Sequence, residues 1–297
     1  MAVVFRFTTP VDAMTCRWAV SPLRETTSAV RLLSQPHRQG YHLPWLRAVA
    51  PVLDRLDLTP LLHVLSRHSY SPDFISPPPA GPSPRFDDEI AAVRATPESQ
   101  VAAELARSPG ARRFATDPAE ARTQLADVLE SVWRNLIEPW WPRIRDILEA
   151  DIAHRTRALV DGGLAAALAD LHPAIRWEHH TLTVDLGTNA ERRMDGVGML
   201  LMPSVFEWPG VGVSLDPPWP PTIDYPARGI AALWQQVEPA EQLHRLIGRT
   251  RATLLAALSE PRSTTGLART CALPASTVSE QVRILRETGL VTTHRVG

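Results

Sequence analysis

The hydrophobic pattern of this chain changes its period near residue 173, and that change constrains the fold more than any other feature. Between residues 87 and 171 apolar side chains recur at helical spacing, as Leu125, Leu129 and Val132 illustrate. Beyond Pro173 the period falls to two, which is typical of strands with one buried face. Helices followed by strands predict an α+β fold. We therefore expect a mainly helical N-terminal domain with a small antiparallel sheet.

Turn and cap residues locate individual elements within this pattern. Ser21 followed by Pro22 has the form of an N-cap and an N1 proline, and predicts a helix that runs to Leu33. The alternating segments 175–178 and 181–185 predict a hairpin. Further strands are expected at 3–7, 199–206 and 211–215, and a helical segment at 228–234.

A proline-rich segment, SPPPAGPSP, occupies residues 76–84. It can form neither a helix nor a central strand, because proline lacks the N–H that both require. It is therefore a loop or a semi-rigid linker. Residues 1–240 are expected to form one sensing or dimerisation domain of α+β structure, or two lobes split near this segment.

The last 52 residues have a different organisation. Helices are expected over 246–258, 264–270 and 275–288, with a tight turn before the third. Gly289 then fits the C′ position of a helix end, and residues 290–296 alternate like a strand. Two short helices joined by a tight turn and followed by a strand form the arrangement of a winged helix-turn-helix. We assign this domain to residues 241–297.

The motifs TVSxxVxxL and LRETGLV, together with LAR in the second helix, resemble the winged helix-turn-helix of ArsR-type bacterial repressors. The resemblance implies that the third helix lies in a major groove of DNA and that the following strand begins the wing. The preceding region, with its DPPWPP and LMPSVF stretches, resembles an uncharacterised domain found ahead of such segments in high-GC bacteria. That second likeness implies a regulator architecture and supplies no ligand.

The spacing of the third helix assigns its two faces. Val278, Val282 and Leu285 recur at intervals that place them inward. By the resemblance, the residues that meet base edges or adjacent phosphates are Ser276, Thr277, Ser279, Gln281 and Arg283. The DNA backbone would meet Arg269, Arg286 and Arg295, with His294 and Arg295 at the start of the wing.

Charge is divided unequally between the two parts of the chain. Residues 246–297 contain seven Arg and three Glu, which gives a formal charge of +4. The whole chain carries −1, so the remainder carries −5. A basic terminal segment on an acidic body is the asymmetry expected if only that segment meets DNA.

Several residues depart from the family pattern and favour a second interpretation. Pro274 occupies the capping position of the third helix, where the family usually has Ser. Gly266 falls inside the second helix, where glycine costs about 1 kcal/mol relative to Ala. Glu280 places a negative charge near the expected phosphates. The chain reaches Gly297 at about the wing tip, so the wing is expected to be incomplete. The alternative is an interaction protein whose degenerate helix-turn-helix serves dimerisation without binding DNA.

Composition excludes several protein classes. Hydrophobic residues make up 44% of the chain and charged residues 21%, as in ordinary globular proteins. No apolar run approaches the roughly 18 residues of a membrane-spanning helix, and the N-terminus lacks the pattern of a signal peptide. Two cysteines, Cys16 and Cys271, are too few for a disulfide framework. We expect a cytoplasmic protein without a membrane partner.

No metal, cofactor or catalytic site is expected. His179 and His180 are adjacent on the expected hairpin, and neighbouring residues on a strand point to opposite faces, so one metal ion would not take both. Cys271 lies alone beside the turn and is interpreted as a small buried hydrophobe. GxSxG, HExxH, P-loop and GxGxxG motifs are missing from any credible context.

All nine Trp residues lie at or before Trp234. They have two interpretations: each fills the core of a large domain, or several line a pocket for a small-molecule effector. The chain is thus predicted to be a DNA-binding transcriptional regulator, not an enzyme, whose partners are operator DNA, a second copy in a homodimer and a small-molecule effector. An N-terminal enzyme with an accessory helix-turn-helix remains a third interpretation, and would require a catalytically arranged pocket.

Overall fold

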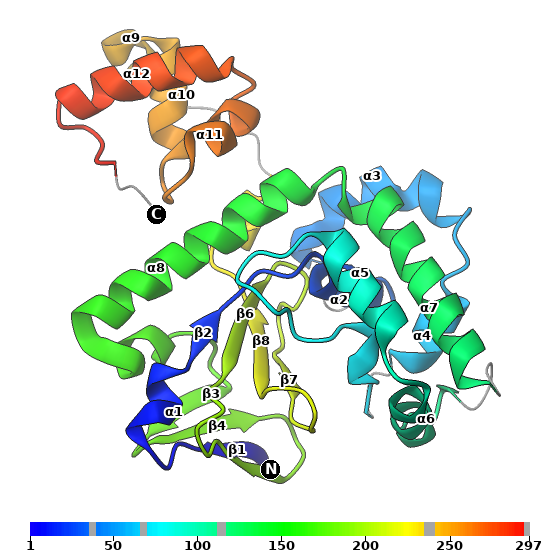
Figure 1. Cartoon of the computed structure of the whole chain (residues 1–297). Helices are drawn as coiled ribbons and strands as arrows, with labels where there is room; N and C mark the ends of the chain where they lie inside the picture. The colour runs from blue at the N-terminus through cyan, green and yellow to red at the C-terminus, as the bar shows by residue number, and fades with distance from the viewer. Residues whose placement is uncertain (36–39, 66–69, 112–116, 235–240, 294–297) are drawn as a thin grey trace.

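The computed structural model describes residues 1–35, 40–65, 70–111, 117–234 and 241–293 (Figure 1). A group of helices and two small sheets form the larger part of the molecule, and a compact group of short helices forms one end. The α+β class predicted from the hydrophobic pattern is confirmed. None of the helices in the described ranges combines the length and apolar character that a bilayer crossing requires.

The helical part is built around α2 (Pro22–Leu33). Ser21 caps this helix, since its Oγ accepts a hydrogen bond from the amide of Arg24 at 2.9 Å, and the predicted start and end are both confirmed. Every residue from Pro22 to Val30 is buried, because helices cover one side of α2 and the strand β6 covers another. The surrounding helices are α3 (Leu43–Leu53), α4 (Thr59–Val64), α5 (Phe86–Ala95), α6 (Glu98–Arg107), α7 (Pro118–Val132) and α8 (Trp141–Leu168).

The described residues form two four-stranded sheets. The first has the order β3-β4-β1-β5 and contains β1 (Ala2–Arg6), β3 (Ile175–Glu178), β4 (Thr181–Asp185) and β5 (Ala190–Arg193). The second has the order β2-β6-β8-β7 and contains β2 (Arg17–Trp18), β6 (Leu200–Ser204), β7 (Gly212–Ser214) and β8 (Thr222–Pro226).

The expectation of a single antiparallel sheet was wrong, because both sheets are mixed. β1 pairs antiparallel with β4 but parallel with β5, and β6 pairs parallel with both β2 and β8. The physical reason is that β1 and β2 come from the start of the chain and join strands that follow the whole helical segment. Local alternation of apolar residues identifies a strand but carries no information about such distant pairing.

The predicted hairpin is confirmed, with Ile175 opposite Val184 and Glu178 opposite Thr181. His179 and His180 form its two-residue turn, with φ values of 47° and 60°. Positive φ at both turn positions is the conformation that matches the twist of the flanking strands. The two imidazoles therefore belong to a turn and not, as assumed from the sequence, to a strand.

The tryptophans pack in or against the core. Trp45 is fully buried and donates a hydrogen bond from Nε1 to the carbonyl oxygen of Leu136 at 3.1 Å. Leu136 belongs to a π-helical turn, η5 (Trp133–Ile137), in which the i→i+5 spacing alters the usual helical bonding. The ring of Trp133 stacks on Phe86 at 4.6 Å. These contacts fit the core-filling interpretation for the two tryptophans.

The proline-rich segment 76–84 packs against the chain between β2 and α2. Pro77 and Pro79 are buried, and the carbonyl oxygen of Pro82 accepts a hydrogen bond from the amide of Val20 at 3.0 Å. The remaining short elements are α1 (Pro10–Met14), η2 (Gly40–His42), η3 (Asp73–Ile75) and η6 (Ile230–Ala232). The helical segment expected at 228–234 is thus only one 3-10 turn.

The terminal group of helices, called the module below, contains α9 (Glu241–Ile247), α10 (Arg249–Ala257), α11 (Thr264–Thr270) and α12 (Ala275–Glu287). Its small core is formed by Leu254, Ala257, Leu267, Val278 and Leu285. The helix expected over 246–258 is broken at Gly248, where φ is 83°. Glycine tolerates this left-handed conformation, so the chain turns between α9 and α10.

The end of α12 agrees with the sequence, but the strand expected after it does not form in the described residues. Gly289 has φ of 74°, as its C′ position requires. The amides of Leu290 and Val291 both donate to the carbonyl oxygen of Leu285, at 2.9 and 3.3 Å. These bonds fold residues 290–293 back onto the helix end, and residues 294–296 of the expected strand lie outside the described ranges.

Candidate nucleic-acid interface

One face of α12 is polar and accessible to solvent. Val278 and Leu285 are buried in the module core, and Val282 packs against it. The opposite face carries exposed side chains at Ser276, Glu280, Arg283 and Glu287. On the flanks Ser279 and Arg286 are exposed, and Thr277 and Gln281 are half-buried. In Figure 1, α12 lies on the side of the module that faces away from α8. The module thus presents a helix of four turns whose outer face carries hydrogen-bonding groups.

Caps and turns position α12 against the rest of the module. Ser263 Oγ accepts a hydrogen bond from the amide of Gly266 at 3.0 Å and so caps α11. Ala272 has φ of 53° in the turn between the two helices, and Leu273 donates its amide to the carbonyl oxygen of Ala268 at 3.0 Å. Pro274 provides no side-chain cap for α12. The amides of its first turn are therefore available to an external acceptor.

Arg283, which the sequence assigns to DNA, is paired within its own helix. Its Nη1 donates to both carboxylate oxygens of Glu287, at 2.8 and 3.0 Å, and both side chains are about half exposed. An exposed pair at this spacing contributes about 0.3–0.5 kcal/mol. Arg283 can therefore exchange Glu287 for a phosphate or a guanine at small cost. Glu280 is exposed on the same helix.

Arg269 lies apart from the other predicted contacts. It is on α11, and its Nη2 is 3.4 Å from Oδ1 of Asp146 on α8, whose side chain is only 3% exposed. Arg269 is thus directed toward the body of the protein, whereas Ser276, Ser279 and Arg283 share the outer face of α12. His294 and Arg295 lie outside the described residues.

The contact between Arg269 and Asp146 was not found from the sequence. Asp146 lies on an amphipathic helix far from the module in sequence, and its side chain there has no distinguishing pattern. Gly266 was the available signal: a Cβ at this position would lie 2.7 Å from Oδ2 of Asp146. The glycine that departs from good helix propensity is the residue that permits the close approach of α8.

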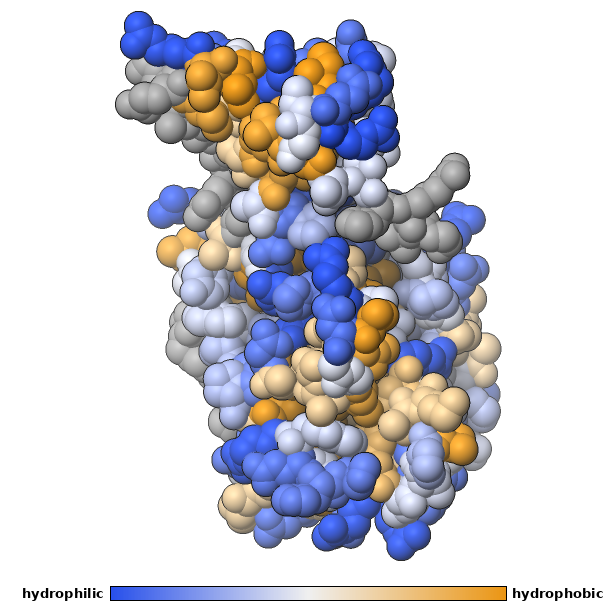
Figure 2. Space-filling view, turned by 90° about the vertical axis from the view of Figure 1, so that its left-hand side faces the viewer, coloured by the Kyte–Doolittle hydropathy of each residue, from blue (hydrophilic) through white to orange (hydrophobic). Residues whose placement is uncertain are grey.

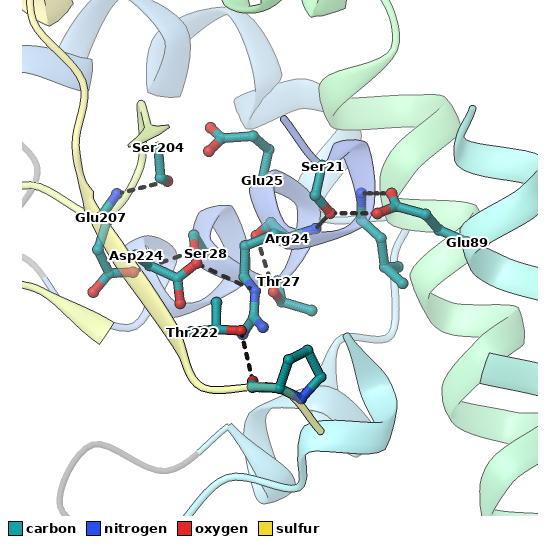
Figure 3. Close-up of polar contacts among 12 residues, drawn as sticks. Ser21, Arg24, Glu25, Thr27, Ser28, Glu89, Ser204, Glu207, Thr222 and Asp224 are labelled. Atoms are coloured by element: carbon teal, nitrogen blue, oxygen red, sulfur yellow. Dashed lines mark hydrogen bonds and ion pairs between the residues drawn. The ribbon is translucent and has the colours of Figure 1, made fainter. Parts of the chain in front are cut away.

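Figure 3 shows a second cluster of polar side chains, buried between α2 and the second sheet. Arg24 Nε is 3.4 Å from Oδ1 of Asp224 on β8, and both side chains are almost fully buried. On the other side of α2, Glu89 accepts hydrogen bonds from Ser21 Oγ at 2.6 Å and from the amide of Leu23 at 2.9 Å. These contacts connect α2 both to α5, which carries Glu89, and to the second sheet, which carries Asp224.

Two carboxyl groups of this region hold protons near neutral pH. Burial raises the pKa of Glu25 to about 8, although the amide of Val205 donates to both of its oxygens. Burial also raises the pKa of Glu89 to about 7, against the opposing effect of its hydrogen bonds. Protonation at these positions lowers the cost of burying several carboxylates around one arginine.

No group of three or more His, Cys, Asp or Glu side chains in the described ranges is arranged to hold a metal ion. Cys271 is half-buried at the end of α11 and packs against the module core, and burial raises the pKa of its thiol. His179 and His180 face solvent in their turn.

Two family descriptions match the chain. Residues 80–231, just over half of the chain, match a family of unknown function, DUF5937. Residues 246–294 match a helix-turn-helix domain, in agreement with the geometry of α11 and α12. No curated protein and no solved structure matches the chain. The chain belongs to the DUF5937 family and carries a C-terminal helix-turn-helix domain.

Proposed function

We propose that this protein is a transcriptional regulator of the ArsR-like winged type, in which α12 enters the major groove of operator DNA. The observation that carries the proposal is the helix-turn-helix module with a solvent-exposed polar face on α12. Ser276, Thr277, Ser279, Gln281 and Arg283 would meet base edges or nearby phosphates. Arg269, Arg286 and Arg295 would meet the DNA backbone, and His294 and Arg295 would begin the wing.

We assign sensing and dimerisation to residues 1–240 and DNA binding to residues 241–297. A homodimer would place two copies of α12 on two half-sites of one operator, about one helical turn apart. Leu246 and Leu290 support an additional contact by the module, since both are largely exposed. Figure 2 shows hydrophobic side chains beside hydrophilic ones on the surface of this end of the molecule.

A small-molecule effector would bind in the N-terminal domain. Support comes from aromatic side chains at the edge of its helical core. Trp140 and Trp234 are half-buried with ring centroids 5.2 Å apart, and the exposed Tyr41 contacts Trp208 at 4.5 Å. Partly exposed aromatic rings of this kind recognise apolar ligands. Quenching of tryptophan fluorescence by candidate metabolites tests this part of the proposal.

The decisive experiment is a fluorescence-anisotropy titration of the full chain with DNA from upstream of its gene, at two salt concentrations. Binding that weakens as salt rises is expected, because each phosphate contact releases condensed counterions. Arg283→Ala should weaken binding and flatten the salt dependence. Arg157→Ala, at an exposed position of α8, is the matched control and should behave like the parent chain. Equal binding by the Arg283 variant over the whole salt range would overturn the assignment of α12.

A dimerisation protein that does not bind DNA is the second candidate. It is favoured by one observation: Arg269 and Arg283, two of the arginines assigned to DNA, are each paired with a carboxylate. This function predicts an oligomer, measured by light scattering, together with no salt-sensitive affinity for duplex DNA.

A further inference from the structure

The module rests on the N-terminal part of α8 through α11 (Figure 1). Gly266 is buried at this contact, and its missing side chain lets the Asp146 carboxylate come within the distance that a Cβ would occupy. One turn further along α11, Arg269 reaches the other oxygen of the same carboxylate at 3.4 Å. Gly266 and Arg269, on one face of α11, thus both contact the Asp146 carboxylate of α8.

The Asp146 carboxylate depends on the module for its charge balance. Within the described residues its Oδ2 accepts no hydrogen bond, and the side chain is 3% exposed. Burial raises its pKa, and the opposing positive charges are Arg269 and Arg262 of the module and Arg145 of α8 itself. Two of these three cations belong to the module, so separation of the module from α8 would remove them from the carboxylate.

A second point of contact lies beside the first. A Cβ at Gly229 would be 3.6 Å from Cδ1 of Ile147 on α8 and 3.9 Å from Cγ of Glu260, which precedes α11. Glu260 therefore lies close to the backbone after β8, next to the buried residue that follows Asp146. The module is seated on the N-terminal domain at two adjacent positions.

We propose that this contact is a docking interface that competes with DNA for Arg269 and so couples the N-terminal domain to the DNA affinity of the module. The proposal rests on the proposed function, in which Arg269 meets the DNA backbone. While the module is docked, Arg269 pairs with Asp146, and the Asp146 carboxylate occupies the position at which a DNA phosphate would bind the guanidinium. The outer face of α12 stays accessible, so docking lowers DNA affinity without abolishing it.

The structure also gives a route by which the N-terminal domain can act on this interface. Asp151, on the next part of α8, accepts hydrogen bonds from Tyr225 Oη at 2.7 Å and from the amide of Arg228 at 3.1 Å. These bonds fix α8 to β8 and to the segment that contains Gly229. A ligand or partner that shifts α8 against the second sheet would therefore move Asp146 and Gly229, which are the two points of contact with the module.

Two variants break the docking by different means. Asp146→Asn removes the charge that Arg269 faces. Gly266→Ala introduces a side chain that forces the carboxylate away, while it raises the intrinsic helix propensity of α11 by about 1 kcal/mol. Loss of docking in this variant is therefore not a sign of an unfolded module. Asp161→Asn is the matched control, because it makes the same acid-to-amide change at an exposed position of the same helix, away from Arg145.

The first measurement is amide hydrogen exchange of the full chain in the absence of DNA. Both docking variants should exchange faster than the parent in α11 and in residues 141–148, and the control should not. Exchange in the core of α12 near Leu285 should stay unchanged, which shows that the module is folded. Parent-like protection in both docking variants would overturn the interface.

The second measurement is binding of a mixed-sequence DNA duplex, and of the DNA upstream of the gene, at two salt concentrations. Asp146→Asn and Gly266→Ala should bind about five- to tenfold more tightly than the parent and show a steeper salt dependence, by about one counterion for the freed arginine. Arg269→Ala combined with Asp146→Asn should remove both gains. Variants that lose docking and bind DNA no better than the control would overturn the competition. If no chain binds DNA, the proposed function and the coupling both fail, while hydrogen exchange still decides the docking.

Discussion

The module and the N-terminal domain are built by opposite means. The module core joins residues that are close in sequence, from Leu254 to Leu285. The N-terminal domain pairs its first strands with strands that follow the helical segment, and it buries charged residues such as Arg24 and Asp224 beside its central helix. Local pattern therefore determines the first region, whereas the second depends on contacts between distant segments.

All tryptophans lie in the N-terminal domain, so the two regions can be followed separately. Tryptophan fluorescence reports unfolding of that domain, and far-ultraviolet circular dichroism reports both regions.

The largest effect is expected for Trp45→Ala. Removal of this fully buried ring leaves a cavity and also removes the donor to the carbonyl oxygen of Leu136. The free energy of unfolding of the N-terminal domain should fall by about 3–5 kcal/mol. A denaturant titration followed by tryptophan fluorescence measures this change in the free energy of unfolding. Hydrogen exchange of the α12 amides should change little in native buffer, and a parallel loss of protection there would show that the two regions unfold as one unit.

The next effect is a dependence on pH. Glu25 has a pKa of about 8 in the folded protein and an ordinary value near 4.5 when unfolded, so the folded state binds the extra proton between these values. The free energy of unfolding should therefore fall as pH rises from about 4.5 to 8, by an amount on the order of a few kcal/mol.

Glu25→Gln should remove the Glu25 share of this slope and leave the smaller share of Glu89, whose pKa is raised only to about 7. Above pH 8 the variant should be more stable than the parent. Denaturant titrations followed by fluorescence at several pH values test it. Glu191→Gln on β5 is the control, because that side chain is exposed. A slope as steep as that of the parent in the Glu25 variant would assign the pH dependence to other groups.

A smaller effect is expected at the cap of α11. Ser263→Ala removes the acceptor of the Gly266 amide and should destabilise the module by about 1 kcal/mol. Hydrogen exchange in α11 should accelerate, while the fluorescence transition of the N-terminal domain stays where it is. A shift of that transition would show that docking of the module adds to the stability of the N-terminal domain.

The smallest effect on stability is expected for Arg283→Ala. The exposed pair with Glu287 contributes less than about 0.5 kcal/mol, so thermal unfolding should hardly change. Binding to duplex DNA should nevertheless weaken, and the salt slope should fall by about one. A clear loss of stability together with unchanged DNA binding would make this arginine a structural residue.

The same comparison explains what the sequence could and could not predict. The cap at Ser21, the hairpin at 175–185 and the start of α12 follow from local patterns, and all are found in the structure. The parallel pairing of β1 with β5 does not follow from local patterns, because each strand is compatible with several partners. The break at Gly248 was missed because the apolar residues around it continue the helical spacing.

The candidate site also has one part that the sequence predicts and one part that it does not. The outward face of α12 follows from the spacing of Val278 and Leu285, and the structure places those two residues in the core as the spacing predicts. That its outer residues contact DNA stays a prediction. The partner of Arg269 could not be predicted, because Asp146 is brought to it by the packing of α8 and not by any local feature.

The position of β1 has a consequence for synthesis of the chain. Val3 and Phe5 emerge from the ribosome before the helices, yet the strands that pair with theirs, β4 and β5, follow about 180 residues later. At ordinary translation rates this interval is roughly ten to forty seconds. The apolar strand β1 is therefore exposed without its partner strands while the helices form. It is the segment to which we expect a nascent-chain chaperone to bind. The module core joins residues that are close in sequence, so it can form as soon as residues 254–285 have emerged.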